Sequence, residues 1–120
     1  MSDRPSPSIK PLVTIDDLSR LDIRVGRVVR VSDVSGSRKL VKLDVSFGEF
    51  RRTILAGLKG ERERPEEIEG RQAIFLVNLE PKEMAGHVSE GMLLDIGYAD
   101  GLSPVLAIPE AEVPDGTRLG

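Results

Sequence analysis

Short runs of β-branched and other apolar residues, separated by glycine, proline and acidic turns, make up most of this chain of 120 residues. In the clearest run, residues 40–47, apolar and polar side chains alternate, which is typical of a strand that buries one face. A Gly48-Glu49 turn then leads into a second run, as in a β-hairpin. The pattern predicts strands at residues 23–31, 40–47, 51–56, 73–79, 92–96 and 105–108.

The first of these runs contains a break in its alternation. Ile23 and Val25 are in phase, but beyond Gly26 the apolar residues Val28 and Val29 are adjacent. A glycine inside a strand, together with a slip of phase, indicates a β-bulge or a sharp bend. We therefore expect a bend near Gly26, of the kind that lets a sheet curl into a barrel.

Helical signals are confined to two short segments. Thr14 can cap a short helix whose first turn holds Asp16 and Asp17, where acidic side chains suit the helix dipole. A helical turn at residues 65–69 begins with proline and is closed by Gly70. One helical turn between the third and fourth strands favours an all-β, five-stranded OB-fold (oligonucleotide/oligosaccharide-binding) barrel, here with an added C-terminal segment.

Length and composition narrow the possible classes of protein. We expect a disordered leader, rich in proline and serine, at residues 1–13 and one domain at residues 14–120. The chain has no cysteine and a single histidine, His87, which excludes disulfides, thiol catalysis and Cys/His zinc sites; we expect no metal and no other cofactor. No run approaches the ~20 apolar residues of a membrane helix, and no hydrophobic signal segment is present. We therefore expect a cytoplasmic protein with no membrane partner.

The net charge of −3 conceals an uneven distribution of charge. Residues 20–64 hold 12 lysines and arginines against 6 acidic residues, whereas residues 65–120 hold 3 against 11. A polyanion responds to the local field of a protein more than to its net charge. The basic half is therefore a candidate surface for nucleic acid, although two ordinary solvated faces would give the same distribution.

The segment at residues 78–94 reads NLEPKEMAGHVSEGMLL and joins two predicted strands with small polar, glycine and methionine residues. Loops held by a rigid scaffold are where binding residues tend to lie. Other motifs precede and follow it in the order LDIRVGRV (21–28), GSRKLVKLDVSFG (36–48), RTILAGL (52–58), PEEIEGR (65–71) and IPEAEVPDGTRL (108–119).

Taken in order over residues 14–120, these motifs resemble the tRNA-binding domain that occurs as a C-terminal appendix of methionyl-tRNA synthetases. The same domain occurs in small stand-alone tRNA-binding proteins. The resemblance implies an OB-fold barrel that forms a homodimer through an added C-terminal segment. It also implies that the chain binds tRNA by its shape more than by its sequence, with an aminoacyl-tRNA synthetase chain as a further candidate partner.

The resemblance also implies which residues bind RNA. Lys39 matches the family's lysine and suits a phosphate contact. Ser89, Gly91 and Met92 match its S-x-G-M loop, which offers hydrogen bonds, close backbone approach and a flexible apolar surface. The candidate RNA-binding residues are Lys39, Ser89, Met92, Gly91, Asn78, Lys82, Arg24, Arg38, Lys42, Arg51 and Arg52.

Each candidate residue also has a purely structural interpretation. In that interpretation, Arg24 forms an ion pair with Asp22 or Asp44, and Lys39 is an ordinary solvated lysine at the end of a strand. In the same interpretation, Asn78 satisfies a turn, Ser89 caps a loop and Met92 fills the core.

The chain departs from the family pattern at two places, which motivates an alternative function. Residues 59–64 contain no aromatic residue where relatives tend to have one, and Lys82 is followed by Glu83 in place of a second basic residue. Few aromatic residues are present to stack on single-stranded bases, so a structured RNA held by its backbone is the better-suited ligand. The alternative is a chaperone-like or scaffold module of the same fold that binds protein.

Catalysis is the third class of function that we considered. His87 and Ser89 are two residues apart, which places them on the same side of an extended segment. No acidic residue is placed to orient the imidazole, and no oxyanion hole is indicated. We therefore do not expect an enzyme.

Overall fold

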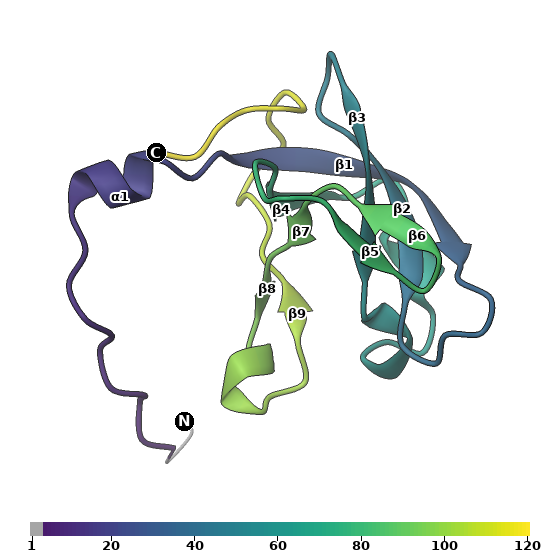
Figure 1. Cartoon of the computed structure of the whole chain (residues 1–120), viewed down its shortest axis with the longest axis horizontal. Helices are drawn as coiled ribbons and strands as arrows, with labels where there is room; N and C mark the ends of the chain where they lie inside the picture. The colour runs from purple at the N-terminus through teal and green to yellow at the C-terminus, as the bar shows by residue number, and fades with distance from the viewer. Residues whose placement is uncertain (1–3) are drawn as a thin grey trace.

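A computed structural model describes residues 4–120; residues 1–3 of the predicted leader lie outside the described part of the chain. At its centre an antiparallel sheet with the strand order β3-β2-β1-β4-β7 curls into a nearly closed barrel (Figure 1). These strands are β1 (Ile23–Asp33), β2 (Val41–Ser46), β3 (Arg51–Ala56), β4 (Gln72–Leu76) and β7 (Met92–Leu93). The all-β, five-stranded barrel predicted from the sequence is confirmed.

Short elements join and extend the barrel. The 3₁₀ turns η1 (Leu58–Gly60) and η2 (Pro65–Ile68) connect β3 to β4, so the predicted helical turn between the third and fourth strands is present. At the N-terminal side, α1 (Ile15–Ser19) begins with the predicted Thr14 cap, whose hydroxyl accepts a hydrogen bond from the Asp17 backbone N–H at 3.2 Å.

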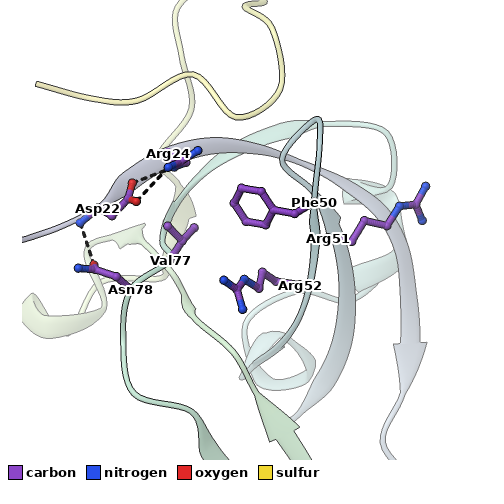
Figure 2. A pocket seen from close by; sticks show the side chains of 7 residues that line it. All are labelled: Asp22, Arg24, Phe50, Arg51, Arg52, Val77 and Asn78. Atoms are coloured by element: carbon purple, nitrogen blue, oxygen red, sulfur yellow. Dashed lines mark hydrogen bonds and ion pairs between the residues drawn. The ribbon is translucent and has the colours of Figure 1, made fainter.

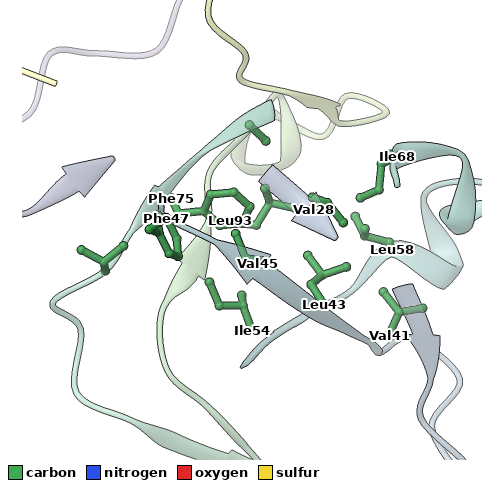
Figure 3. Packing of buried hydrophobic residues seen from close by; sticks show 12 residues of the cluster. Val28, Val41, Leu43, Val45, Phe47, Ile54, Leu58, Ile68, Phe75 and Leu93 are labelled. Atoms are coloured by element: carbon green, nitrogen blue, oxygen red, sulfur yellow. The ribbon is translucent and has the colours of Figure 1, made fainter. Parts of the chain in front are cut away.

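The core lies inside the barrel and follows the alternation of the sequence. Val41, Leu43, Val45 and Phe47 are buried, while the residues between them on β2 are only partly buried, as expected for one inward face. The other strands and the two 3₁₀ turns complete the cluster (Figure 3), with Val28, Ile54, Leu58, Ile68, Ala73, Phe75, Val77 and Leu93.

The irregularity in β1 lies farther along the strand than the sequence predicted. The register with β2 shifts between Val28 and Arg30, not at Gly26. Gly26 has a different role, because a Cβ atom at this position would lie 2.6 Å from Phe47 Cε1 and 2.7 Å from Val45 Cγ1. The glycine thus lets the core side chains of β2 pack directly on the backbone of β1.

The fourth and fifth predicted strands are shorter than expected. β4 ends at Leu76, after which the Val77 backbone N–H donates to the Asp22 carbonyl at 2.9 Å and the chain leaves the sheet. The run at residues 92–96 divides into β7 and β8 (Asp95–Ile96), because β8 leaves the barrel and pairs with β9 (Val105–Leu106). The turn η3 (Tyr98–Asp100) lies in the loop of this β8–β9 hairpin.

A hairpin that the sequence analysis missed lies between β4 and β7. β5 (Lys82–Met84) pairs with β6 (His87–Ser89) across a two-residue turn formed by Ala85 and Gly86. Both turn residues have positive φ, 49° and 82°, which suits a tight hairpin. Alanine rarely takes this conformation, so the usual sequence signal of such a turn is absent.

The two ends of the described chain lie outside the barrel wall. The C-terminal segment runs along β1, where the Gly116 N–H donates to the Val25 carbonyl at 2.7 Å and the Leu119 N–H donates to the Ile23 carbonyl at 2.9 Å. Residues 4–13 carry no helix or strand and lead away from α1 outside the barrel (Figure 1); at their start, the Arg4 side chain donates a hydrogen bond to the Asp100 carbonyl in the loop of the β8–β9 hairpin. Within residues 4–120, no helix has the length and apolar character needed to span a membrane.

Candidate functional site

The S-x-G-M loop is held tightly along the side of β3. The Ser89 hydroxyl accepts a hydrogen bond from the Leu55 backbone N–H at 3.0 Å and donates to the Gly91 carbonyl at 3.1 Å. The Glu90 backbone N–H donates to the Thr53 carbonyl at 2.8 Å, and the Glu90 carboxylate accepts from the Thr53 N–H at 2.9 Å. These bonds tie the loop to the edge strand β3, on the side where the barrel is not closed by strand pairing.

Gly91 is required by the packing of this loop. A Cβ atom at Gly91 would lie 2.8 Å from the Leu76 carbonyl oxygen and 3.2 Å from Ile54 Cδ1. Ser89, which is also buried, uses its hydroxyl on the protein backbone. In the structure, Ser89 and Gly91 therefore shape the loop, and the side chain that they present to solvent is Met92, which is 46% exposed.

One pocket, which we call the lysine pocket, lies at the C-terminal end of β3 and has a volume of about 520 Å³. It brings together Lys39 and Met92, two of the residues singled out in the sequence. The backbone at Lys39 is fixed by a hydrogen bond of 3.0 Å from the Lys59 N–H to its carbonyl. The lining residues are Lys39, Leu55, Ala56, Gly57, Leu58, Gly60, Glu61, Met92, Leu93, Asp95 and Tyr98.

The lysine pocket combines an apolar floor with charges of both signs. Leu55, Leu58 and Leu93 are buried beneath it, and the Lys39 side chain is exposed. Burial raises the pKa of the Glu61 carboxyl above its usual value of 4.5, and the negative charge of Asp95 raises it further. Such a pocket offers a cation for a phosphate, apolar surface for a base, and carboxyl groups that accept hydrogen bonds from hydroxyl or amino groups.

A second pocket, which we call the arginine pocket, lies at the N-terminal end of β3 and has a volume of about 460 Å³. Figure 2 shows the side chains of Phe50, which directly precedes β3, and of Arg52 in β3 pointing into this pocket. Both face Val77 on the opposite wall. Arg51 is among the lining residues, but its side chain points away (Figure 2) and forms an ion pair with Asp44 at 3.1 Å. The lining residues are Asp22, Arg24, Phe50, Arg51, Arg52, Val77 and Asn78.

The arginines of this pocket differ in how well they are paired. Arg24 donates to both oxygens of Asp22, at 2.8 and 3.1 Å, so the ion pair considered in its structural interpretation exists. The hydrogen bond from Arg24 lowers the pKa of the Asp22 carboxyl. Arg52 approaches Glu90 only at 3.7 Å, and its buried Nε has no hydrogen-bond partner among the described residues.

The oxygen and the nitrogen of the Asn78 amide are each hydrogen-bonded at the edge of the arginine pocket. Its Oδ1 accepts a hydrogen bond from the Asp22 backbone N–H at 2.8 Å, and its Nδ2 donates to the Arg20 carbonyl at 2.7 Å. The amide thereby ties the end of β4 to the residues that precede β1. This arrangement matches the turn-satisfying interpretation of Asn78 and positions Asp22 next to Arg24.

The remaining candidate residues lie outside both pockets. Arg38 is exposed next to Lys39, and Lys42 is half-buried on β2, opposite Leu55 of β3. Lys82 is exposed on β5, opposite Ser89 of β6. The predicted set is therefore distributed over two pockets and the strands between them, not gathered in one site.

Several pocket residues were missed in the sequence. The aromatic residues Tyr98 and Phe50 and the acidic residues Glu61 and Asp95 were not among the candidates. A usable signal existed for the aromatic residues, since Phe47 and Phe75 fit the core alternation whereas Phe50 and Tyr98 do not. Within residues 4–120, no three His, Cys, Asp or Glu side chains are grouped so that they could hold a metal ion.

Comparison with known proteins places the chain among synthetase-related domains. Residues 23–118 match the family described as "Putative tRNA binding domain". The methionine–tRNA ligase of Archaeoglobus fulgidus is 42% identical over 110 residues, which cover 92% of this chain and 16% of the ligase. The chain thus spans about a sixth of the length of that relative.

Solved structures give the same placement. The crystal structure of a MetRS-related protein from Pyrococcus horikoshii is similar with a TM-score of 0.84 and 37% identity, and the match covers 92% of this chain and 100% of that one. The chaperone CsaA from Bacillus anthracis is similar with a TM-score of 0.79 and 29% identity, over 92% of this chain and 100% of that one. On its sequence and its barrel, the chain belongs to the tRNA-binding domain family.

Proposed function

We propose that this chain is a non-catalytic module that binds tRNA by its structure and uses the lysine pocket as its main contact. The observation that carries the proposal is the meeting of Lys39 and Met92, far apart in the sequence, at the rim of one pocket. Lys39 supplies the phosphate contact, and Met92 and Tyr98 supply apolar and aromatic surface for a neighbouring base or ribose. Ser89 and Gly91 act through the backbone by holding the loop that carries Met92.

Basic residues around this pocket extend the contact along the RNA backbone. Arg38 and Lys42 flank Lys39 in the sequence, and both belong to the basic part of the chain at residues 20–64. Because phosphate contacts release counterions, binding falls steeply as the salt concentration rises. We expect Lys82, Arg24, Arg51 and Arg52 to add to the positive electrostatic field that attracts the RNA.

The proposed assembly is a homodimer. Two exposed apolar groups lie outside the barrel, one on the N-terminal arm and α1 and one on the C-terminal hairpin, and isolated chains rarely leave so much apolar surface uncovered. A two-fold dimer also doubles the RNA contacts and raises apparent affinity without new contacts. The exposed residues are Ile9, Leu12, Val13, Ile15 and Leu18 in the first group and Ile96, Leu102, Val105 and Ile108 in the second.

The proposed setting is tRNA aminoacylation in the cytoplasm. The similar protein of Archaeoglobus fulgidus is a methionine–tRNA ligase, and the matching region makes up 16% of its length. We propose that this chain assists an aminoacyl-tRNA synthetase of the methionyl type by holding tRNA.

The proposed dimer has its own test, which is sedimentation of the chain at concentrations where it binds tRNA. A monomer under these conditions would contradict the dimer but not the RNA contact.

Protein binding is the second candidate function. The similarity to the chaperone CsaA favours it, together with the exposed apolar residues on the arm and the C-terminal hairpin. A chaperone-like or scaffold module would hold apolar segments of a partner against these residues. The tRNA-binding proposal is preferred because Lys39 and Met92, the methionine of the intact S-x-G-M loop, both line the lysine pocket.

A mobility-shift experiment separates the two functions. The purified chain is titrated into tRNA, a single-stranded RNA of equal length and a DNA duplex, at low and at high salt, and separately into an unfolded polypeptide. We expect preference for tRNA, weakened by salt. Equal binding of all nucleic acids would contradict structure-specific binding, and binding of the polypeptide alone would favour the chaperone-like function.

Variants in the same experiment locate the contact. Lys39→Ala combined with Met92→Ala removes the cation and the exposed methionine of the lysine pocket, and we expect this variant to lose most tRNA binding. The matched control combines Arg71→Ala with Val88→Ala, because both residues are exposed and line neither pocket. Equal loss in the two double variants would contradict a role for the lysine pocket.

A further inference from the structure

We propose that the arginine pocket is a separate nucleotide-binding site, which takes one nucleotide unit and holds its phosphate group with Arg52 and Arg24. This inference goes beyond the proposed function, because the pocket lies at the opposite end of β3 from Lys39 and shares no lining residue with the lysine pocket. The site can therefore be occupied by a free nucleotide even if the lysine pocket is empty.

The two arginines occupy positions that would normally hold core residues. Arg24 of β1 pairs with Phe75 of β4, and Arg52 of β3 pairs with Val45 of β2. Residues directly opposite each other in an antiparallel sheet carry their side chains on the same face. Since Phe75 and Val45 are completely buried, both guanidinium groups lie on the inward face at the end of the barrel, where they line the pocket.

Three phenylalanine rings in contact with one another hold these guanidinium groups in place. Phe75 meets Phe47 edge to face with ring centres 5.6 Å apart, and Phe47 stacks on Phe50 at 5.1 Å. The guanidinium carbons of Arg24 and Arg52 each lie 5.3 Å from the centre of the Phe50 ring. Cation–π contacts of this kind orient arginine side chains without using their N–H donors. The Nε–H of Arg52 is therefore available for a ligand, whereas Arg24 already donates from Nε and Nη2 to Asp22 and offers a ligand its remaining N–H groups.

The charge in the pocket is only partly balanced by the protein. Asp22 neutralises Arg24, whereas Glu90 lies 3.7 Å from Arg52 and the Arg52 Nε lacks a partner among residues 4–120. A buried N–H without a partner is rare in folded proteins, because it costs desolvation without compensation. An oxyanion next to Arg52 supplies the missing acceptor, and a guanidinium fork suits the oxygens of a phosphate.

The size of the pocket favours a nucleotide over a bare anion. Its volume of about 460 Å³ lies within the ~300–1,000 Å³ that is usual for small-molecule sites. A single phosphate ion would fill a small part of that space. Val77, which is buried on the wall facing Phe50 (Figure 2), supplies apolar surface for the sugar or base that the phosphate carries.

The test is an NMR titration of the full chain with adenosine 5′-monophosphate, with adenosine and with inorganic phosphate. We expect the monophosphate to shift the backbone signals of residues lining the arginine pocket and the side-chain Nε–H signal of Arg52. Adenosine lacks the phosphate and is expected to cause no shift at these residues. Inorganic phosphate is expected to bind there more weakly than the monophosphate. Absence of shifts at the pocket with the monophosphate would overturn the proposal.

Arg52→Gln is the decisive variant, and Arg71→Gln is its matched control. Both remove one positive charge, but Arg71 is exposed and lines neither pocket. We expect Arg52→Gln to weaken monophosphate binding by ~10-fold or more and Arg71→Gln to leave it nearly unchanged. Arg52→Lys keeps the charge but loses the fork, so intermediate weakening is expected. Equal weakening by Arg71→Gln and Arg52→Gln would overturn the proposal, because it would indicate a general charge effect.

Addition of tRNA to the monophosphate complex identifies the natural source of the nucleotide. Displacement of the monophosphate from the pocket means that the pocket receives a nucleotide of the RNA, and retention means that it receives a free nucleotide; either result supports the proposed site. The outcome is separable from the proposed function. A chain that binds tRNA but leaves the arginine pocket unshifted by the monophosphate refutes this inference alone, and the converse result refutes tRNA binding alone.

Discussion

The two pockets at the ends of β3 differ in how the protein treats their charges. In the arginine pocket a hydrogen bond from Arg24 lowers the pKa of Asp22, and aromatic rings fix the cations. In the lysine pocket burial and Asp95 raise the pKa of Glu61, and the cation is an exposed lysine. One end of the strand is thus organised for a fixed anion, and the other is an adaptable surface of mixed polarity.

The difference teaches that a single strand can carry two kinds of nucleic-acid contact. Arginine held on a phenylalanine is pre-oriented, so little rotamer entropy is lost when an oxyanion binds. Lysine on a flexible stem and an exposed methionine adjust to many shapes, which suits recognition of an RNA surface. The S-x-G-M loop lies between the pockets and ties them together, because Glu90 reaches Arg52 and Met92 borders the lysine pocket.

The largest effect is expected for Gly91→Ala, which breaks the shared support of both pockets. The new methyl group would lie 2.8 Å from the Leu76 carbonyl oxygen, so the loop or the end of β4 must move. Because the clash is with a backbone atom, we expect a loss of ~3 kcal/mol or more in the free energy of unfolding, measured by urea denaturation. Gly60→Ala is the control, since no atom lies within 4 Å of its Cβ position, and equal stability of the two variants would contradict the packing role of Gly91.

A smaller effect is expected for Ser89→Ala, which removes support from the lysine pocket alone. It leaves the buried Leu55 backbone N–H, beside the lysine pocket, without its acceptor, which costs ~1–3 kcal/mol. Asn78→Ala is the corresponding change at the arginine pocket, but its hydrogen bonds are exposed, so we expect ~0.5–1.5 kcal/mol. Thermal unfolding of both variants measures the two losses of stability. A larger loss for Asn78→Ala than for Ser89→Ala would contradict the expected order.

The smallest effect concerns pH and the two carboxyl groups with opposite shifts. Because its pKa is raised, the Glu61 carboxyl stays protonated to a higher pH in the folded chain than in the unfolded chain. The contribution of Glu61 to stability is therefore fully present below pH 4.5 and is lost as the pH rises through the folded pKa. The lowered pKa of Asp22 acts the other way, because its contribution is present above pH 3.8 and is lost as the pH falls through the folded value.

Glu61→Gln and Asp22→Asn should therefore change the pH profile of stability in opposite senses. We expect Glu61→Gln to be more stable than the parent chain at neutral pH and Asp22→Asn to be less stable, with both differences shrinking in acid. Free energies of unfolding between acid and neutral pH provide the measurement. Glu63→Gln serves as the exposed control, and a gain in stability for Glu63→Gln equal to that for Glu61→Gln would rule out burial as the cause.

The barrel was predictable because its signals are local. The alternation at residues 40–47 fixes one face of β2, and the turn at residues 65–69 follows from its proline and glycine. The β5–β6 hairpin was missed because its turn uses Ala85 with a positive φ, for which the sequence offers no preference. The bulge was misplaced because Gly26 serves the packing of Phe47 instead of the bend.

The candidate site was only partly predictable, since pockets depend on contacts between distant segments. Lys39 and Met92 were identified through the family motifs, and the structure places them together. Arg52 was a candidate RNA-binding residue, but its inward position was not predicted, although its strand phase with the buried Ile54 indicates that position. The Phe50 contacts arise only when β1 and β3 close around the same barrel end, which no local pattern encodes.

The most direct test of the account is the salt dependence of tRNA affinity for the parent chain, Lys39→Gln and the control Arg71→Gln. Each phosphate contact contributes about one unit to the slope of log affinity against log salt. We predict a steep slope for the parent chain, a slope smaller by about 1 for Lys39→Gln, and an unchanged slope for Arg71→Gln. A Lys39→Gln slope equal to that of the parent chain would contradict the central claim that the lysine pocket holds the RNA backbone.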